Sequence, residues 1–177
     1  MSSFGSGYNQ NENVKHFLEV ERFSVSPQTV FTSELTERLY TWWSAHQPAL
    51  PKRSEFDILD HRKLVPYLYL YRFNEPNVIE YRLNGEAIVA AIGRSQAGNV
   101  FSAADEDPEM AALANYLMDV AEARQAHCCR GTLAFVDKKH VCFESIDCPL
   151  LGDDGNVSHV VGLLVPEFAK GGRRSAL

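Results

Sequence analysis

The sequence has no apolar run long enough to cross a membrane and no excess of basic residues. The longest uninterrupted apolar runs, such as AIVAAI at residues 87–92, fall far short of the roughly 20 residues that a transmembrane helix needs. Lys and Arg total 17 against 23 Asp and Glu, which gives a formal net charge of −6. Nucleic acids and anionic membrane surfaces require clustered cations, so we expect neither as a partner.

Secretory signals and close cysteine pairs are also missing. The first sixteen residues are polar and lack the apolar middle of a signal peptide, so we expect a cytoplasmic protein. The four cysteines, Cys128, Cys129, Cys142 and Cys148, would then lie in a reducing compartment and are predicted to be free thiols.

Catalytic signatures are absent as well. The chain contains no G-x-S-x-G, no G-x-x-x-x-G-K and no H-E-x-x-H. Glu55, Asp57 and Asp60 lie beside His61 and could do acid/base chemistry, but their position before a short helix favours capping and solvation. We therefore predict no catalytic residue and no enzyme activity.

What is present fits one domain of α+β class. With 177 residues and 45% hydrophobic content, the chain can bury one core of ordinary size. We predict a loose arm over residues 1–30, a single domain over 31–168 and a solvated tail over 169–177. The domain would begin with an amphipathic helix at 33–46, with Ser33 as its N-cap.

The middle of the domain predicts two strands followed by helices. Residues 67–73 and 78–84 are rich in aromatic and β-branched residues and flank a turn. A short helix follows over 85–93. A long one over 107–126 has Asp107 as its cap and Pro108 at its first position.

The last third predicts three more strands, at 127–136, 140–150 and 157–168, separated by turn-forming residues. If Lys138 and Lys139 form a two-residue turn, Thr132 pairs with Ser145 and Arg130 with Asp147. This order predicts a five-stranded antiparallel sheet with the helices packed on one face, preceded by the 33–46 helix.

That register raises the alternative of a metal site. Cys129 and Cys148 would lie opposite each other, and His127 would follow on the same face. Zinc sites usually contain close ligand pairs such as C-x₂-C, which this chain lacks, so buried free thiols are the favoured interpretation. His127 is also the best placed haem ligand, although a hydrogen-bonded or surface histidine is the more ordinary reading.

Several segments together resemble the PAS superfamily, in particular the short stand-alone PAS proteins of alphaproteobacteria. LYTWWSAHQPALPKRSEFD followed by LVPYLYLY is similar to that family's opening block. YRLNGEAIVAAIGRSQAG is similar to its strand, helix and glycine loop, and FESIDCPLLGDDGNVSHVVGLL to its closing hairpin. The resemblance covers about residues 35–166.

The resemblance implies a sensory or adaptor module of bacterial signal transduction, without catalysis and with no single ligand specified. A core pocket would be walled by the strand and helices that converge there, and its ligand-binding residues would be Tyr81, Leu83, Ile88, Ile92, Tyr116 and Leu117. The cofactor stays unknown. The cysteine motif of flavin-binding light sensors, NCRFLQ, is missing from the helical middle, so covalent flavin photochemistry is not expected.

We expect no attached output domain, so the signal would leave by contact with a partner such as a histidine kinase or another regulator. We also expect a homodimer through the 33–46 helix, because Leu35, Leu39 and Trp42 form one apolar stripe while Tyr40 and Trp43 begin a second. The alternative from another class is a small-molecule enzyme on a cone-shaped, ketosteroid-isomerase-like α+β fold. The position of the long helix between the second and third strands favours PAS.

Overall fold

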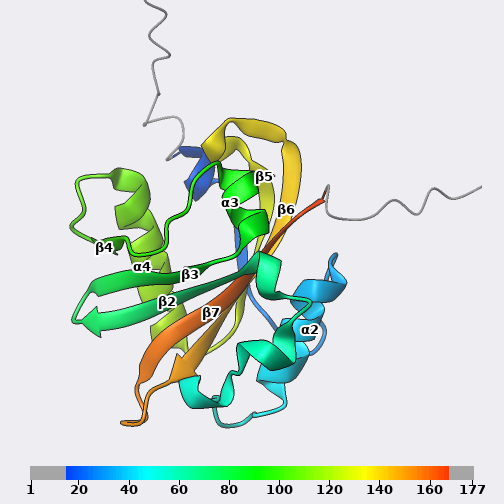
Figure 1. Cartoon of the computed structure of the whole chain (residues 1–177), viewed down its shortest axis with the longest axis vertical. Helices are drawn as coiled ribbons and strands as arrows, with labels where there is room; N and C mark the ends of the chain where they lie inside the picture. Colours follow the sequence, from blue (N-terminus) through cyan, green and yellow to red (C-terminus); the bar gives the residue numbers. More distant parts are fainter. Residues whose placement is uncertain (1–14, 168–177) are drawn as a thin grey trace, which may run out of the picture.

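The computed structural model describes residues 15–167 and contains one antiparallel sheet (Figure 1). All five predicted strands are present, and each boundary falls within a few residues of its predicted place. They are β2 (Leu68–Glu75), β3 (Val78–Asn84), β5 (His127–Leu133), β6 (Lys138–Leu151) and β7 (Val157–Pro166).

The sheet nevertheless has seven strands, because two short ones extend its edges. The strand order is β1-β5-β6-β7-β2-β3-β4, in which β1 (Glu21–Ser24) pairs with β5 and β4 (Val100–Ser102) pairs with β3. Strands of four and three residues are too short to show a period-2 pattern, which is why the sequence did not predict them.

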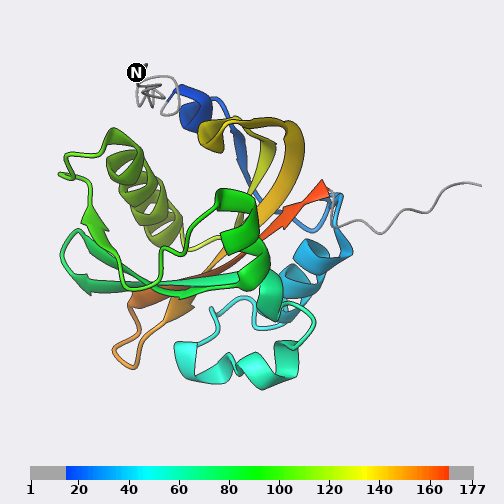
Figure 2. The same cartoon turned by 45° about the horizontal axis from the view of Figure 1, so that its top comes forward.

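Helices cover both faces of the sheet, which corrects the prediction of a single covered face. Helices α3 (Glu86–Ile92) and α4 (Pro108–Ala123) lie on one side. Helix α2 (Glu34–Ser44) lies on the other, with the 3₁₀ helices η1 (Arg53–Glu55), η2 (Ile58–His61) and η3 (Val65–Tyr67) following it in the chain (Figures 1 and 2). The buried residues accordingly form two clusters, one containing Leu117 of α4 and the other Leu39 of α2. The central strands are therefore buried on both faces.

Helix α2 begins as its sequence predicts, because the Ser33 side chain accepts a hydrogen bond from the Leu35 backbone N–H. Its second aromatic stripe is covered at Trp43 and half-buried at Tyr40. Trp43 is 4% exposed, and its indole N–H donates to the Pro149 carbonyl oxygen over 2.9 Å. Tyr40 stacks on Trp43. Trp43 thus belongs to the core rather than to a free surface. Self-association through this helix stays a prediction, but Trp43 is not available to contact a second copy.

The register of β5 with β6 differs from the predicted one by three residues. Thr132 pairs with Cys142 rather than Ser145, and Arg130 pairs with Glu144 rather than Asp147. The tight turn at Lys138–Lys139 does not form. Instead η4 (Ala134–Val136) and a left-handed Asp137 connect the strands. An odd shift moves every partner to the other face of the sheet.

Part of the segment predicted as a loose arm forms secondary structure. Residues 15–18 form a helical turn, and β1 then pairs with β5 from Glu21↔Arg130 to Ser24↔His127. The rest of the predicted arm, residues 1–14, and the predicted tail lie outside the described residues. Among residues 15–167, no helix is both long and apolar enough to span a bilayer.

Candidate functional site

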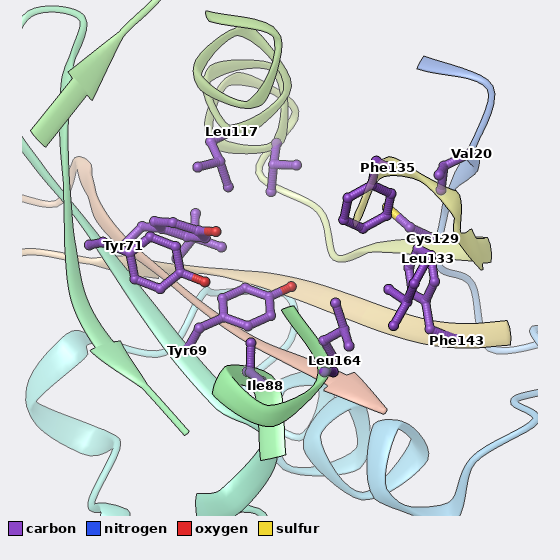
Figure 3. Close-up of a cluster of buried hydrophobic side chains, with 14 of the residues drawn as sticks. Val20, Tyr69, Tyr71, Ile88, Leu117, Cys129, Leu133, Phe135, Phe143 and Leu164 are labelled. Carbon is purple, nitrogen blue, oxygen red and sulfur yellow. The ribbon is translucent and has the colours of Figure 1, made fainter. Parts of the chain in front are cut away.

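A cavity of about 350 Å³ lies between the sheet and helices α3 and α4. Figure 3 shows Leu117 of α4 projecting toward the rings of Tyr69 and Tyr71, with Phe135 at one side of the same interior. Most of the wall is apolar or aromatic, with a few charged and amide groups among it. The lining residues are Phe17, Val20, Arg22, Tyr69, Tyr71, Tyr81, Ile88, Ile92, Gly93, Arg94, Gln96, Glu109, Met110, Leu113, Tyr116, Cys129, Phe135, Val136, Phe143, Ser145, Asp147 and Leu164.

Four of the six predicted pocket residues, Tyr81, Ile88, Ile92 and Tyr116, lie in this wall. Leu117 is fully buried in the same hydrophobic cluster but does not line the cavity.

Leu83 faces the opposite side of the sheet, which corrects its place in the predicted pocket. Leu70 pairs with Leu83 but the next residue, Tyr71, pairs with Tyr81, so Arg82 is an extra residue in β3. Such a bulge reverses the alternation of side chains. Leu83 therefore packs with the α2 cluster and lines a separate groove with Leu70 and other residues.

The polar part of the cavity lining, here called its floor, consists of Asp147 and the tyrosine and cysteine side chains around it. Its buried carboxylate, Asp147, was not identified from the sequence as part of the site. Asp147 is 2% exposed, and each of its oxygens accepts one tyrosine hydroxyl. Tyr69 donates to Oδ1 and Tyr116 to Oδ2, both over 2.7 Å. Burial raises the pKa of Asp147, while the bonds from Tyr116 and Tyr69 oppose that rise.

The bond from Tyr69 depends on a glycine. Gly162 pairs with Asp147 on one side and with Tyr69 on the other, so the Tyr69 side chain crosses Gly162 to reach the carboxylate. A Cβ at Gly162 would lie 2.2 Å from a ring carbon of Tyr69. Only glycine allows this approach.

The remaining polar groups of the floor are neutral hydrogen-bonding groups. The Cys129 thiol donates to the Tyr116 hydroxyl over 3.3 Å, and burial, together with the Asp147 charge, raises the pKa of Cys129 to about 11. Burial raises the pKa of Tyr81 to about 12 and that of Tyr71 well above its ordinary value. At neutral pH these three residues therefore offer hydroxyl and thiol groups rather than a phenolate or thiolate.

The residues considered for metal or haem do not converge. Cys129 pairs with Ser145, and Cys148 lies on the other face of the sheet within the α2 cluster. His127 does not line the cavity. One of its ring nitrogens contacts the Ser24 hydroxyl and the other the Gln125 carbonyl oxygen. No group of three or more His, Cys, Asp or Glu able to hold a metal occurs within the described part of the chain.

The acidic group near His61 has structural roles. The Asp57 side chain accepts the Leu59 N–H at the start of η2, and Glu55 accepts the Lys52 N–H over 2.6 Å. The cap of this short helix is thus Asp57.

Comparison with known proteins agrees with this architecture. A family model of the PAS domain matches residues 31–165, and the chain therefore belongs to the PAS domain family. Among solved structures, an RNA-binding light-oxygen-voltage receptor is similar, with 10% identity and a TM-score of 0.44. The alignment covers 83% of this chain and 38% of the receptor chain. No curated protein matches the sequence.

PAS domains are sensory and signalling modules, so the family defines the class of this protein. It does not favour the alternative of an enzyme on a cone-shaped fold.

Proposed function

We propose that this chain is a non-catalytic sensory module that binds a small, largely apolar molecule in the cavity beneath α3 and α4. The observation that supports this most directly is the cavity itself. Its volume of about 350 Å³ lies at the lower end of the range for small-molecule sites. Its wall is mainly aromatic and aliphatic, with a few converging polar groups, as such sites usually are.

The polar groups of the floor are suited to orienting a ligand rather than to transforming one. The carboxylate of Asp147 is occupied by two tyrosine hydroxyls, and burial keeps the nearby thiol of Cys129 protonated. Neither group is a free base or nucleophile at neutral pH. The signal would pass to another protein, such as a histidine kinase or regulator, by surface contact.

A neutral fluorescent probe tests the cavity. N-phenyl-1-naphthylamine fluoresces strongly only in apolar surroundings, and we expect the wild-type chain to bind about one equivalent. Replacing Leu113 on α4 by Trp places a larger side chain in the cavity wall and should weaken binding at least about tenfold. Fluorescence titration measures both affinities.

The matched control is Leu83→Trp, which makes the same change on the opposite face of the sheet. It should leave the affinity for the dye unchanged. A wild-type chain that binds no dye, or equal weakening by both substitutions, would count against a ligand-binding cavity at this place.

A further inference from the structure

The segment before the matched family domain forms part of the cavity wall. Phe17, Val20 and Arg22 line the cavity, yet all three precede residue 31, where the family match begins. Phe17 packs edge to face on Phe135, with ring centroids 5.9 Å apart. Strand β1 holds the segment against β5.

Arg22 is the cation of this segment that lines the cavity. Its terminal nitrogens donate to the carbonyl oxygens of Phe17 over 2.6 Å and of Val20 over 3.2 Å. The guanidinium carbon lies 4.7 Å from the centre of the Phe17 ring and 5.3 Å from that of Tyr116. These contacts fix the side chain at the cavity wall.

The guanidinium of Arg22 has no anionic partner. No carboxylate within residues 15–167 forms an ion pair with it, its Nε is buried without a hydrogen-bond partner, and each terminal nitrogen uses only one of its two N–H groups. The charge of Asp147 is close enough to interact with Arg22, but the hydrogen bonds of this carboxylate come from Tyr69 and Tyr116. A cation at the wall of a largely apolar cavity without an ion-pair partner is costly, so a ligand that brings a negative charge to it gains affinity.

We propose that Arg22 anchors the ligand of this cavity and that the ligand is a small organic acid with an aromatic or branched apolar body. This inference rests on the proposed function and names the chemical class that the site would take. The carboxylate of the ligand accepts from the terminal N–H groups of Arg22 that are not bonded to Phe17 and Val20, and its apolar body lies against the tyrosine, leucine and phenylalanine wall. A guanidinium suits a carboxylate in both charge and geometry.

The other charges of the wall agree better with an acid than with an amine. Arg94 adds a second cation to the lining, at an exposed position. Of the two acids that line the cavity, Glu109 has its pKa raised by burial and by the Asp107 charge, and Asp147 is held by the two tyrosines. An amine would meet two guanidinium groups and leave Arg22 without an ion-pair partner.

The test compares two probes that differ only in the head group. Isothermal titration calorimetry measures the binding of 2-naphthoate and of its neutral isostere 2-naphthamide to the wild-type chain and to Arg22→Gln. We expect the wild type to bind the acid at least about tenfold more tightly than the amide. In Arg22→Gln this preference should disappear, while the affinity for the amide stays within about twofold.

Arg94→Gln is the matched control, because it removes the other arginine of the lining, and it should keep the preference for the acid. Arg22→Lys keeps the charge and should keep part of the preference. Equal binding of the two probes by the wild type overturns the assignment of an acid. A preference that survives in Arg22→Gln, or an equal loss of both probes, overturns the role of Arg22 as anchor. These outcomes are separate from the dye titration, which tests whether the cavity binds any apolar molecule.

Discussion

At the scale of single residues, the site depends on a close contact that uses the smallest amino acid. Tyr69 reaches Asp147 only by lying across Gly162, where a Cβ would meet two ring carbons and the hydroxyl oxygen of the tyrosine within 2.6 Å. This close contact places the Tyr69 hydroxyl on the Asp147 carboxylate and orients the Tyr69 ring toward the cavity that it lines. Strand glycines of this kind mark places where another group must come near.

Replacing Gly162 by Ala should therefore displace Tyr69 and break its bond to Asp147. We expect the free energy of unfolding to fall by about 2–3 kcal/mol, from overpacking and from a buried carboxylate that loses a donor. Urea unfolding followed by circular dichroism measures the change. The control is Gly131→Ala, whose Cβ would meet its neighbours at 3.4 Å or more, and which should cost far less. Equal losses in the two variants would show that Tyr69 is not confined as described.

At the scale of elements, one buried carboxylate joins helix α2 to the sheet. Glu144 of β6 accepts the backbone N–H groups of Thr32 and Ser33 over 2.9 and 3.0 Å, as well as the Thr36 hydroxyl. Arg130 completes the set with a 2.9 Å ion pair. Burial opposes ionisation of Glu144, but these bonds outweigh it and lower its pKa below the ordinary 4.5.

The lowered pKa gives the docking of α2 a definite pH dependence. Because the folded state holds Glu144 ionised more strongly than the unfolded state does, its contribution is complete above about pH 4.5 and declines as the pH falls through the lower, folded value. Glu144→Gln should thus reduce the free energy of unfolding by about 2–4 kcal/mol at pH 7 and by clearly less at pH 3. Urea unfolding at the two pH values checks this.

Glu80→Gln serves as the control, since the ion pair of Glu80 with Arg82 lies at the surface and should matter little at either pH. A loss for Glu144→Gln that is the same at pH 3 and pH 7 would mean that its charge is not what holds α2.

The element types could be predicted from the sequence because their patterns are local. The aromatic and β-branched residues of β2 and β3 and the capped, amphipathic α4 each lie within one stretch of the chain. The faces of those elements could not all be predicted. The bulge at Arg82 moves Leu83 away from Tyr81, although the two residues are two apart.

Irregular local structure and partners from other parts of the chain also explain why the predicted β5–β6 register and the predicted site residues were partly wrong. The pairing of Arg130 with Asp147 looked favourable because the charges match, but η4 and Asp137 shift the strand and give Arg130 the equally acidic Glu144. Asp147 is then free to accept the two tyrosines. Arg22 was missed because β1 has only four residues, and because two of the elements that place it, α4 and β5, lie far along the chain.

At the scale of the whole molecule, stability should decrease from the centre of the sheet toward its edges. Strands β6 and β7 are buried over 143–150 and 160–166 and pair with each other over nine residue pairs, from Phe143↔Pro166 to Leu151↔Val157. Strand β1, at one edge, has four residues and borders solvent. Short edge strands with few buried contacts open locally at a lower free energy than central ones. The part of the cavity wall that lies next to β1 should therefore be the easiest to displace.

This difference in local stability predicts that Phe17 stabilises β1 at the edge of the sheet but contributes little to the stability of the central strands. Phe17→Ala removes its contacts with Phe135 and Arg22, and we expect the amides of β1 to exchange hydrogen at least about tenfold faster, while those in the centre of β6 and β7 keep their protection. Hydrogen exchange followed by mass spectrometry resolves the two regions. Leu18→Ala is the neighbouring control, because Leu18 is 61% exposed and its loss should change neither. Faster exchange in β6 and β7 by the same factor would mean that the segment belongs to the global folding unit, and it could then not open by itself to admit a ligand or to present the ligand-bound state to a partner.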